Sequence, residues 1–383
     1  MPLNNSICSY PWNAAAIRPN GAAIPCCRYP NLTDSDIFVD SPDPRNSQHW
    51  RQLREDILAG KLIEGCKSCY QDEANGLESM RQVSLKEFIP INNEVQPLEK
   101  LEVALSNLCN LACAHCSNYF STKWYSEDVK AGRIKKTGVI ENNFSFDHWD
   151  LSKLTELKII GGEPFMEQKR FIELLKKLNL SNINIQICTN GTILPNDELK
   201  LLIKSCKNVF MCVSLDGLGT TNDWYRWPSK FSDVINNMKI YESWWGSAHT
   251  NSHEGKNVYP IVHHVVNAIN IFELEDFVKF MSTDFPNWRI EWDWIRWPHW
   301  QELSVLPPEV KSDLIARFRH LDSCYVDHLL RLNPYKVSID RLQETPTSNW
   351  DTLKKEATKL SQERNLDFLK MVTSYKKYWN INE

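Results

Sequence analysis

The sequence predicts an α/β protein built around a partial (βα)6 barrel, a TIM-like barrel that is left open. Two patterns carry this prediction. Between residues 98 and 300, six short apolar runs alternate with segments that have the length and periodicity of helices. Strands that alternate with helices form a parallel sheet with right-handed crossovers. Six strand–helix units are too few to close a barrel of eight, so we expect an open one.

The predicted strands share a feature at their carboxyl ends, where each apolar run stops at a polar or glycine-containing turn. They cover residues 101–106, 157–160, 183–188, 209–215, 258–266 and 289–295, and the clearest helical segments cover residues 169–178, 196–204, 231–245 and 271–281. Ligands bind at the carboxyl ends of the strands in parallel α/β sheets. We therefore expect the turns after these strands to form the functional site.

Two regions flank this predicted core. Residues 1–85 are rich in turns and poor in apolar side chains, and a segment of this kind needs a metal to hold its shape. Residues 301–383 are charged and mainly helical, and Pro307 and Pro308 open the first helix. The sequence thus predicts three domains, with the boundaries 1–85, 98–300 and 301–383.

Composition and charge exclude several classes of protein. Apolar residues make up 42% of the chain and charged residues 24%, as in globular rather than disordered proteins. The formal net charge is −4, whereas a protein that grips nucleic acid along a broad surface is usually basic. No stretch approaches the ~18 consecutive apolar residues of a membrane helix, and the first five residues contain no secretory signal pattern. We therefore expect a soluble cytoplasmic protein with neither a membrane nor a nucleic acid as its partner.

Cysteine is unevenly distributed along the chain. Eight of the 12 cysteines lie in the first third, in one group before residue 70 and a second group at residues 109–116. In a reducing compartment, clustered cysteines are typical of metal ligands or catalytic groups rather than of disulfides. This distribution predicts two thiolate sites.

The second group forms one tight loop directly after the strand at residues 101–106. Its spacing is Cys-x3-Cys-x2-Cys, with Cys109, Cys113 and Cys116 as the candidate metal ligands. Three thiolates can bind three irons of a cubane cluster and leave the fourth iron without a protein ligand. An open metal position is what catalysis requires, as catalytic zinc sites illustrate. On spacing alone, a zinc knuckle or a set of structural cysteines is an alternative.

This loop, with His115 before its last cysteine, resembles the signature loop of radical S-adenosylmethionine (radical SAM) enzymes. A Gly-Gly-Glu-Pro segment follows that resembles the one binding the methionine amino group, and two polar strand ends resemble those that face the ribose and methionyl groups. An asparagine ends the fifth predicted strand, where the family often contacts adenine or ribose. On this resemblance the candidate cofactor-binding residues are His115, Gly161, Gly162, Glu163, Pro164, Thr189, Asn190, Ser214, Asp216 and Asn267.

The resemblance implies that a 4Fe-4S cluster reductively cleaves S-adenosylmethionine (SAM) to a 5′-deoxyadenosyl radical, which abstracts hydrogen from a substrate. Glu163 would accept hydrogen bonds from the cationic amino group of SAM, and the two glycines before it would let the backbone approach the ligand. In the related enzymes with auxiliary clusters, the substrate is often a peptide or protein, and we expect a peptide or protein side chain here. The resemblance also implies a reductant such as ferredoxin or flavodoxin.

The first group of cysteines supplies four thiolates for a second site: Cys8, Cys26, Cys66 and Cys69. By spacing alone, a zinc ribbon with four cysteine ligands is an alternative. The pattern resembles the twitch domain, a shortened relative of the SPASM domain that holds an auxiliary iron–sulfur cluster, although such modules usually follow the radical SAM core and this one precedes it. We therefore expect one auxiliary cluster with a role in electron transfer, and Cys27 is an alternative ligand to Cys26.

The last predicted strand carries its charges on one face. Arg289, Glu291 and Asp293 alternate with apolar residues, and in a barrel this face points inward. Buried charges are costly unless they are paired or functional. Glu291 and Asp293 are therefore candidates for substrate contact or proton removal, and an ion pair with Arg289 or Arg296 is the structural alternative.

Arg226 is a third catalytic candidate, because its spacing after the turn at residues 214–217 resembles that of an arginine that can reach the cofactor in peptide-modifying members of the family. Two other functions stay open from the sequence. One is a radical SAM dehydrogenase or epimerase of a small alcohol or sugar derivative. The other is a zinc-stapled module that binds RNA or protein, which iron content and SAM cleavage would distinguish from an enzyme.

Overall fold

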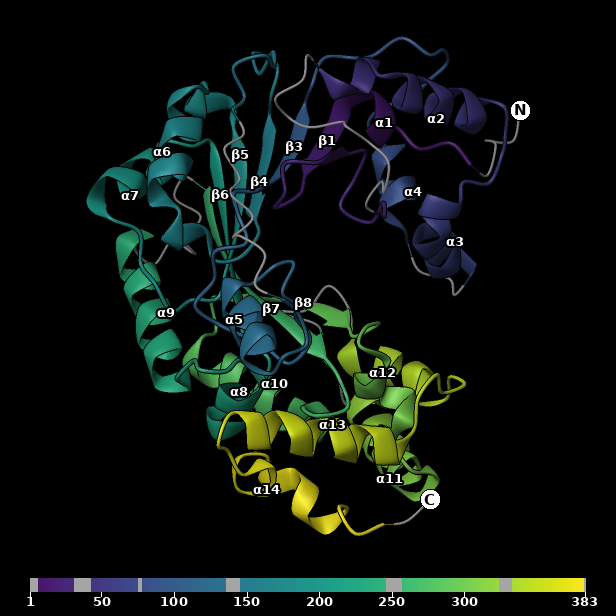
Figure 1. Cartoon of the computed structure of the whole chain (residues 1–383), viewed down its shortest axis with the longest axis vertical. Coiled ribbons are helices and arrows are strands. Elements are labelled where there is room, and N and C mark those ends of the chain that lie inside the picture. Colours follow the sequence, from purple (N-terminus) through teal and green to yellow (C-terminus); the bar gives the residue numbers. More distant parts are fainter. Residues whose placement is uncertain are drawn as a thin grey trace. The chain divides into compact units, whose positions relative to one another are not determined.

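The computed structural model describes residues 6–30, 43–74, 78–135, 145–245, 257–323 and 333–381 (Figure 1). The chain separates into two compact units. The first contains Met1–Leu108, Thr137–Ile187 and Pro195–Val209, and the second contains Cys109–Lys136, Cys188–Leu194 and Phe210–Glu383.

The described strands form an eight-stranded sheet in the order β2-β1-β3-β4-β5-β6-β7-β8. The first unit contains β1 (Ala14–Ile17), β2 (Ala23–Ile24), β3 (Lys100–Ala104), β4 (Glu156–Ile160), most of β5 (Asn184–Thr189) and the start of β6 (Asn208–Ser214). There β1 runs antiparallel to β2 and parallel to β3, and the β3–β4 and β4–β5 pairs are also parallel. The second unit contains the rest of β6 with β7 (Asn257–Val266) and β8 (Arg289–Trp294), and β7 runs parallel to β8.

The predicted α/β class and the mostly parallel sheet are confirmed, and the six predicted strands correspond to β3–β8. The additional strands β1 and β2 lie in residues 1–85, which are rich in turn-forming residues and for which the sequence predicts no strand. β1 consists of three alanines and an isoleucine, all buried, and alanine is depleted in strands. Pairing with β3 therefore makes this segment a strand. The N-terminal cysteine module itself stays a prediction.

In the first unit, local side-chain caps define where helices begin. Ser47 accepts a hydrogen bond from Trp50 N at the start of α2, and Ser79 and Gln82 form a capping box at the start of α4. The helices are α1 (Tyr10–Asn13), α2 (Gln48–Leu58), α3 (Lys67–Ala74), α4 (Met80–Ser84), α6 (Gln168–Lys176) and α7 (Asp197–Lys204), with 3-10 turns at Pro44–Asn46, Glu64–Cys66, Pro164–Met166 and Leu180–Asn182.

The second unit has its own apolar core, which joins Trp224, Trp350 and Tyr375 to Ala112 and Ala114 of the cysteine loop. Its helices are α5 (Thr122–Lys130), α8 (Gly219–Tyr225), α9 (Phe231–Trp245), α10 (Leu274–Asp284), α11 (Pro308–Ser323), α12 (Pro334–Leu342), α13 (Trp350–Glu363) and α14 (Phe368–Met371), with 3-10 turns at Ile271–Glu273, His299–Gln301, Leu303–Val305 and Thr373–Lys377. The predicted helical C-terminal segment is present as α11–α14. In the described parts of the chain, no helix is both long and apolar enough to cross a membrane.

Candidate functional site

The three-cysteine loop, residues 109–116, is held by backbone hydrogen bonds to the end of α8 and the segment after it. Ala112 N donates to Trp227 O at 2.6 Å, and Ala114 N donates to Tyr225 O at 2.7 Å. Because alternate residues of the loop bind alternate residues of the partner segment, the two run alongside each other over this stretch. The middle of the loop is therefore fixed by main-chain contacts.

Side chains from other elements bind the carbonyl groups of the same loop. Trp124 Nε1 on α5 donates to Cys113 O at 2.7 Å. Gln301 Nε2, which lies far along the sequence, donates to Ala114 O at 2.8 Å. Buried carbonyl groups need such partners, so the shape of the loop is determined by the fold of the second unit.

The three thiols of the loop differ in how far they are buried. Cys113 is buried, and Cys109 and Cys116 are half-buried. Burial, followed by the charges of Cys113 and Cys109, raises the pKa of the Cys116 thiol to about 12. In a cubane cluster each cysteine binds its own iron, so the thiols surround the cluster rather than converge on one ion. This donor set fits such a cluster.

Within the described ranges, no three His, Cys, Asp or Glu side chains are grouped so that they could hold a single metal ion.

A buried ion pair lies beside the cysteine loop. Arg226 Nη1 donates to Asp216 Oδ2 at 2.5 Å, and Asp216 has an exposed fraction of 0%. Oδ1 of the same carboxylate accepts a hydrogen bond from Val265 N at 2.9 Å. Burial acts to lower the pKa of Arg226, but the charges of Cys113 and Asp216 outweigh it and raise the pKa above its ordinary value. The guanidinium therefore stays charged and opposes the negative charge of thiolates in the loop.

His115 belongs to the same group of buried side chains. Its ring stacks on Tyr225 with the centroids 5.2 Å apart and the planes at 20°. Burial lowers the pKa of His115 to about 4, so the imidazole is neutral at pH 7. Among the residues that the structure describes, Nδ1 of His115 is buried without a hydrogen-bond partner. Tertiary structure thus brings together three of the predicted site residues: His115, Asp216 and Arg226.

The Gly-Gly-Glu-Pro segment lies against the residues that lead into the cysteine loop. Gly162 N donates to Ser106 O at 3.0 Å, and Glu163 N donates to Leu108 O at 2.7 Å. A Cβ at position 162 would stand 2.2 Å from Leu108 O, and Gly161 has a φ of 120°. Both positions therefore require glycine, for close approach and for backbone conformation.

Glu163 itself is a buried carboxylate. Its exposed fraction is 1%, and its Oε1 accepts a hydrogen bond from Phe165 N at 3.1 Å. The next residue, Pro164, is the first residue of the 3-10 turn Pro164–Met166 and is also buried. The turn therefore holds the carboxylate of Glu163 at a defined place after β4.

Other predicted cofactor-binding residues lie at the carboxyl ends of β5 and β6. Asn190 Nδ2 donates to Asn110 Oδ1 at 2.9 Å and lies 3.9 Å from Cys109 Sγ, so this side chain contacts the cysteine loop directly. Thr189 Oγ1 accepts a hydrogen bond from Gly191 N at 3.1 Å. Ser214 is half-buried and is the last residue of β6.

Asn267 is also buried, but its polar atoms are engaged in the turn after β7. Oδ1 accepts hydrogen bonds from Ile269 N at 2.9 Å and Asn270 N at 3.3 Å, and Nδ2 donates to Val265 O at 2.8 Å. The side chain therefore shapes the turn. Its predicted contact with the cofactor stays a prediction.

The central part of the chain also matches a known family. Residues 103–245 match the family model described as the radical SAM superfamily. This chain contains a radical SAM domain. A domain of this superfamily implies a 4Fe-4S cluster and SAM as cofactors. The match begins in β3 and includes the cysteine loop, the Gly-Gly-Glu-Pro segment, β5, β6 and α8.

Other comparisons cover whole chains. A search of curated proteins found no match. Solved structures that resemble this chain include native anSMEcpe with bound AdoMet, at 17% identity and a TM-score of 0.39 over 60% of this chain and 60% of that one. Native anSMEcpe with bound AdoMet and the Cp18Cys peptide is 17% identical with a TM-score of 0.36, over 62% of this chain and 63% of that one. Streptococcus suis SuiB bound to the precursor peptide SuiA is 13% identical with a TM-score of 0.35, over 78% of this chain and 70% of that one. The alignment thus spans 60% of the length of the first of these structures.

The charges on β8, after the matched part of the radical SAM domain, are less buried than the sequence predicts. Asp293 is exposed and accepts a hydrogen bond from Trp294 N at 2.8 Å. Glu291 is half-exposed and forms an ion pair with Arg289, with 34% of its side chain exposed. The expectation that these charges are buried is therefore wrong for Asp293 and only partly right for Glu291, because alternation along a strand does not tell how much solvent reaches either face. Their catalytic role stays a prediction.

The cysteines that precede the radical SAM domain all lie in the first unit. Cys8 precedes α1, Cys26 follows β2, Cys66 ends the 3-10 turn Glu64–Cys66, and Cys69 lies in the first turn of α3. Burial raises the pKa of Cys8 to about 11 and that of Cys66 to about 12, and the charge of Cys69 acts on both thiols in the same direction. The thiols of Cys8, Cys66 and Cys69 thus influence one another's charge state, and a shared metal site stays a prediction.

The neighbouring Cys26 and Cys27 have different surroundings. Burial and then the charges of Cys27, Cys8 and Cys66 raise the pKa of Cys26. For Cys27, the largest influence after burial is Glu102 on β3, and its Sγ lies 3.7 Å from Met80 Sδ. The pKa of Cys26 is thus affected by other thiols more than that of Cys27, and which of the two would bind a metal stays a prediction.

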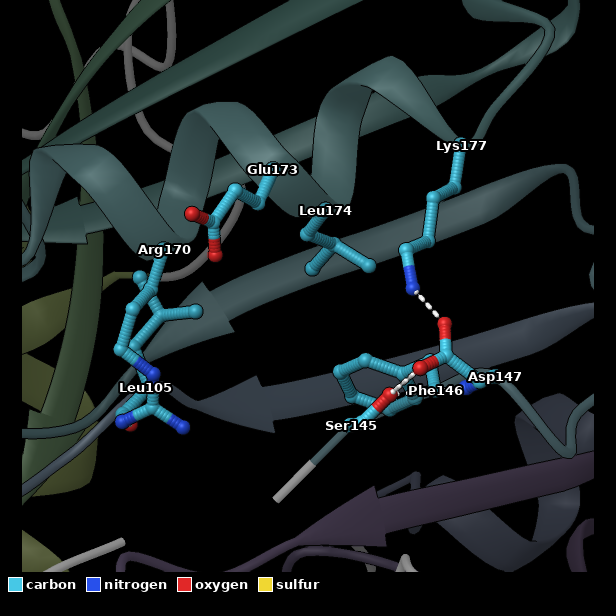
Figure 2. Close-up of a pocket in the computed structure, with 8 residues that line it drawn as sticks. All are labelled: Leu105, Ser145, Phe146, Asp147, Arg170, Glu173, Leu174 and Lys177. Carbon is cyan, nitrogen blue, oxygen red and sulfur yellow. Dashed lines mark hydrogen bonds and ion pairs between the residues drawn. The ribbon is translucent and has the colours of Figure 1, made fainter. Parts of the chain in front are cut away.

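A separate cavity of about 280 Å³ lies in the first unit beside α6 (Figure 2). Lys177 points toward Asp147 and forms an ion pair with it, while Arg170 Nη1 donates to Leu105 O at 2.5 Å. The predicted site residues do not line this cavity. Its charges bind one another and the backbone, so it is a recess between α6 and residues 145–147.

Sequence patterns missed the residues that hold the cysteine loop from a distance. Gln301, Trp124 and Arg364 each bind a carbonyl group of the loop. Gln301 and Arg364 lie outside any motif and more than a hundred residues after the loop. A sequence pattern carries no sign of such contacts, because only the packing of the second unit brings them to the loop.

Proposed function

We propose that this protein is a radical SAM enzyme that abstracts hydrogen from a peptide or protein side chain. The observation that carries the proposal is the three-cysteine loop, whose shape is held by hydrogen bonds from α5, the end of α8 and the turn His299–Gln301. A loop held in this way presents its three thiolates without a large rearrangement. Its position in the radical SAM domain agrees with this role.

Named residues would hold the two cofactors. Cys109, Cys113 and Cys116 would bind a 4Fe-4S cluster, and His115 and Glu163 lead the residues that would bind SAM. When bound, these cofactors supply a 5′-deoxyadenosyl radical for hydrogen abstraction. Glu163 would accept hydrogen bonds from the amino group of SAM, and the neutral ring of His115 would offer its Nδ1 to the same ligand.

The surroundings of the loop suit a reaction from which water must be excluded. Ala112, Ala114, Trp124 and Tyr225 are buried in one apolar core with the loop. Arg226 remains charged beside Asp216 and can balance the negative charge of a cluster and a carboxylate. We propose that these residues shield the reactive site from solvent and side reactions.

The proposal of a peptide substrate is supported by Arg226, whose spacing resembles that in the peptide-modifying branch of the family. Glu291 and Asp293 on β8 are the side chains that we propose for substrate contact or proton removal. Their partial exposure leaves them accessible to a substrate. A one-electron donor such as ferredoxin or flavodoxin would supply the electron.

We also propose that Cys8, Cys26, Cys66 and Cys69 hold one auxiliary iron–sulfur cluster, which accepts an electron after hydrogen abstraction. The mutual effect of these thiols on their pKa values supports a shared site. Four cysteine ligands leave no iron open, which favours electron transfer over binding of substrate.

The test begins with anaerobic reconstitution of the full chain with iron and sulfide. We expect about eight irons per chain, as two cubane clusters require, and production of 5′-deoxyadenosine after dithionite and SAM are added. Cys113→Ala should abolish SAM cleavage, whereas Cys206→Ala, which removes a buried thiol outside both sites, should not. Zinc in place of iron and no cleavage would refute the proposed enzyme.

The auxiliary site has its own test, the double variant Cys66→Ala and Cys69→Ala. We expect about four irons per chain, with SAM cleavage retained and turnover of a peptide substrate lost. A variant that lacks these irons yet turns over substrate at the normal rate would rule out the electron-transfer role.

A further inference from the structure

Arg364, the residue after α13, reaches back across the sequence to the cysteine loop. Its side chain is 1% exposed, and Nη2 donates to Ala112 O at 2.7 Å. Ala112 immediately precedes Cys113 in the loop. A cation from the C-terminal segment is therefore bonded to the backbone next to a proposed cluster ligand.

A second contact links Arg364 to Cys113 through an aromatic ring. The guanidinium lies 4.9 Å from the centroid of the Trp124 ring, a distance typical of a cation–π interaction. The indole nitrogen of Trp124 donates to Cys113 O at 2.7 Å. Arg364 thus contacts the loop both directly and through Trp124.

The carboxylate that pairs with Arg364 is more exposed than the cation. Nε and Nη2 of Arg364 donate to Glu127 Oε2 at 3.2 and 3.0 Å, and 18% of the Glu127 side chain is exposed. Water screens an exposed charge more than a buried one. The positive charge of Arg364 is therefore screened less than the negative charge of Glu127. Within the described residues, Nη1 of Arg364 has no hydrogen-bond partner.

We propose that Arg364 is a positioning residue that raises the reduction potential of the cluster at Cys109, Cys113 and Cys116. The inference rests on the proposed function of this loop. Reduction adds one electron from a one-electron donor to the cluster, with no bond made or broken and no proton taken up. A buried cation stabilises the more negative, reduced state, and net charge and hydrogen bonds around a cluster are known determinants of its potential.

The test is a redox titration of the reconstituted full chain, with the reduced cluster followed by electron paramagnetic resonance. Arg364→Gln removes the charge, and we expect the ratio of reduced to oxidised cluster at a fixed potential to fall about tenfold, which corresponds to about 59 mV for one electron. Arg364→Lys keeps the charge and should restore most of the ratio. Glu127→Gln removes the anion instead, so the ratio should rise.

Two controls separate an effect of charge from an effect on structure. Iron content is measured for each variant, and Arg317→Gln removes an arginine that also pairs with a glutamate, Glu275 on α10 at 2.7 Å, but whose side chain is 38% exposed. The opposite directions expected for Arg364→Gln and Glu127→Gln are the decisive result, because loss of packing would move both variants the same way. Equal potentials in Arg364→Gln and the wild type, or parallel loss of iron from both variants, would overturn the inference. A wild-type chain that binds no iron would overturn the proposed function itself.

Discussion

Replacing Gly162 by alanine tests how the Gly-Gly-Glu-Pro segment is held. A Cβ at this position would lie 2.2 Å from Leu108 O and 2.6 Å from Leu108 C. Both are backbone atoms, so no rotation of a side chain relieves the clash. Ordinary contacts between non-bonded atoms lie near 3.5 Å, so the segment must move by roughly 1 Å.

The cost of that movement follows from the contacts that it disturbs. Hydrogen bonds join Gly162 N to Ser106 O at 3.0 Å and Glu163 N to Leu108 O at 2.7 Å. Each is worth about 1 kcal/mol, and overpacking a dense interior costs about 1–3 kcal/mol. We expect the variant to lose about 3–5 kcal/mol of unfolding free energy, which lowers the Tm by about 6–20 °C at about 2–4 °C per kcal/mol.

The assay is thermal unfolding followed by circular dichroism, with Gly132→Ala as the control. Gly132 has a φ of 71°, and no described atom lies within 4 Å of a Cβ added there. Alanine at this position therefore costs backbone strain alone, about 1–2 kcal/mol. If Gly162→Ala unfolds at or above the temperature of the control, the close approach to Leu108 is not required and the reasoning is refuted.

Three further predictions concern buried polar groups of the second unit. Asp216→Asn leaves Arg226 buried without its counter-charge, so we expect the free energy of unfolding to fall by about 3–5 kcal/mol. A Tm equal to that of the wild type in thermal unfolding would contradict this. Burial lowers the pKa of His264 from 6.5 to about 4. Between these two pH values the unfolded chain binds more protons than the folded chain. The free energy of unfolding therefore falls as the pH drops from 6.5 to 4, by up to about 1.4 kcal/mol per pH unit. His264→Phe should flatten this dependence of unfolding free energy on pH, and an unchanged slope would count against the burial effect. Asn267→Ala removes the acceptor of two backbone hydrogen bonds in the turn after β7, so we expect about 1–2 kcal/mol of destabilisation in urea, and an unchanged midpoint would argue against that role.

Much of the fold was predictable because its signals are local. An apolar run followed by a polar turn marks each of β3–β8, and a helical segment follows most of them. The alanine-rich β1 carries no such signal, since its strand conformation depends on pairing with β3. The polarity of β8 was visible in the sequence, but the exposure of Asp293 was not, because exposure depends on which elements cover each face.

The sequence by itself determined the spacing of the candidate cysteine ligands, the position of the loop after a strand and the pair of glycines at residues 161–162. These features depend only on residues that are neighbours in the chain, whereas the contact that makes Gly162 necessary comes from Leu108, more than fifty residues away. The tertiary structure alone decided that Arg226 pairs with Asp216 and that Arg364 reaches Ala112 O. The reason is that hydrogen bonds and charge pairs between distant segments form only when packing of the apolar core brings those segments together, and no local pattern encodes the partner.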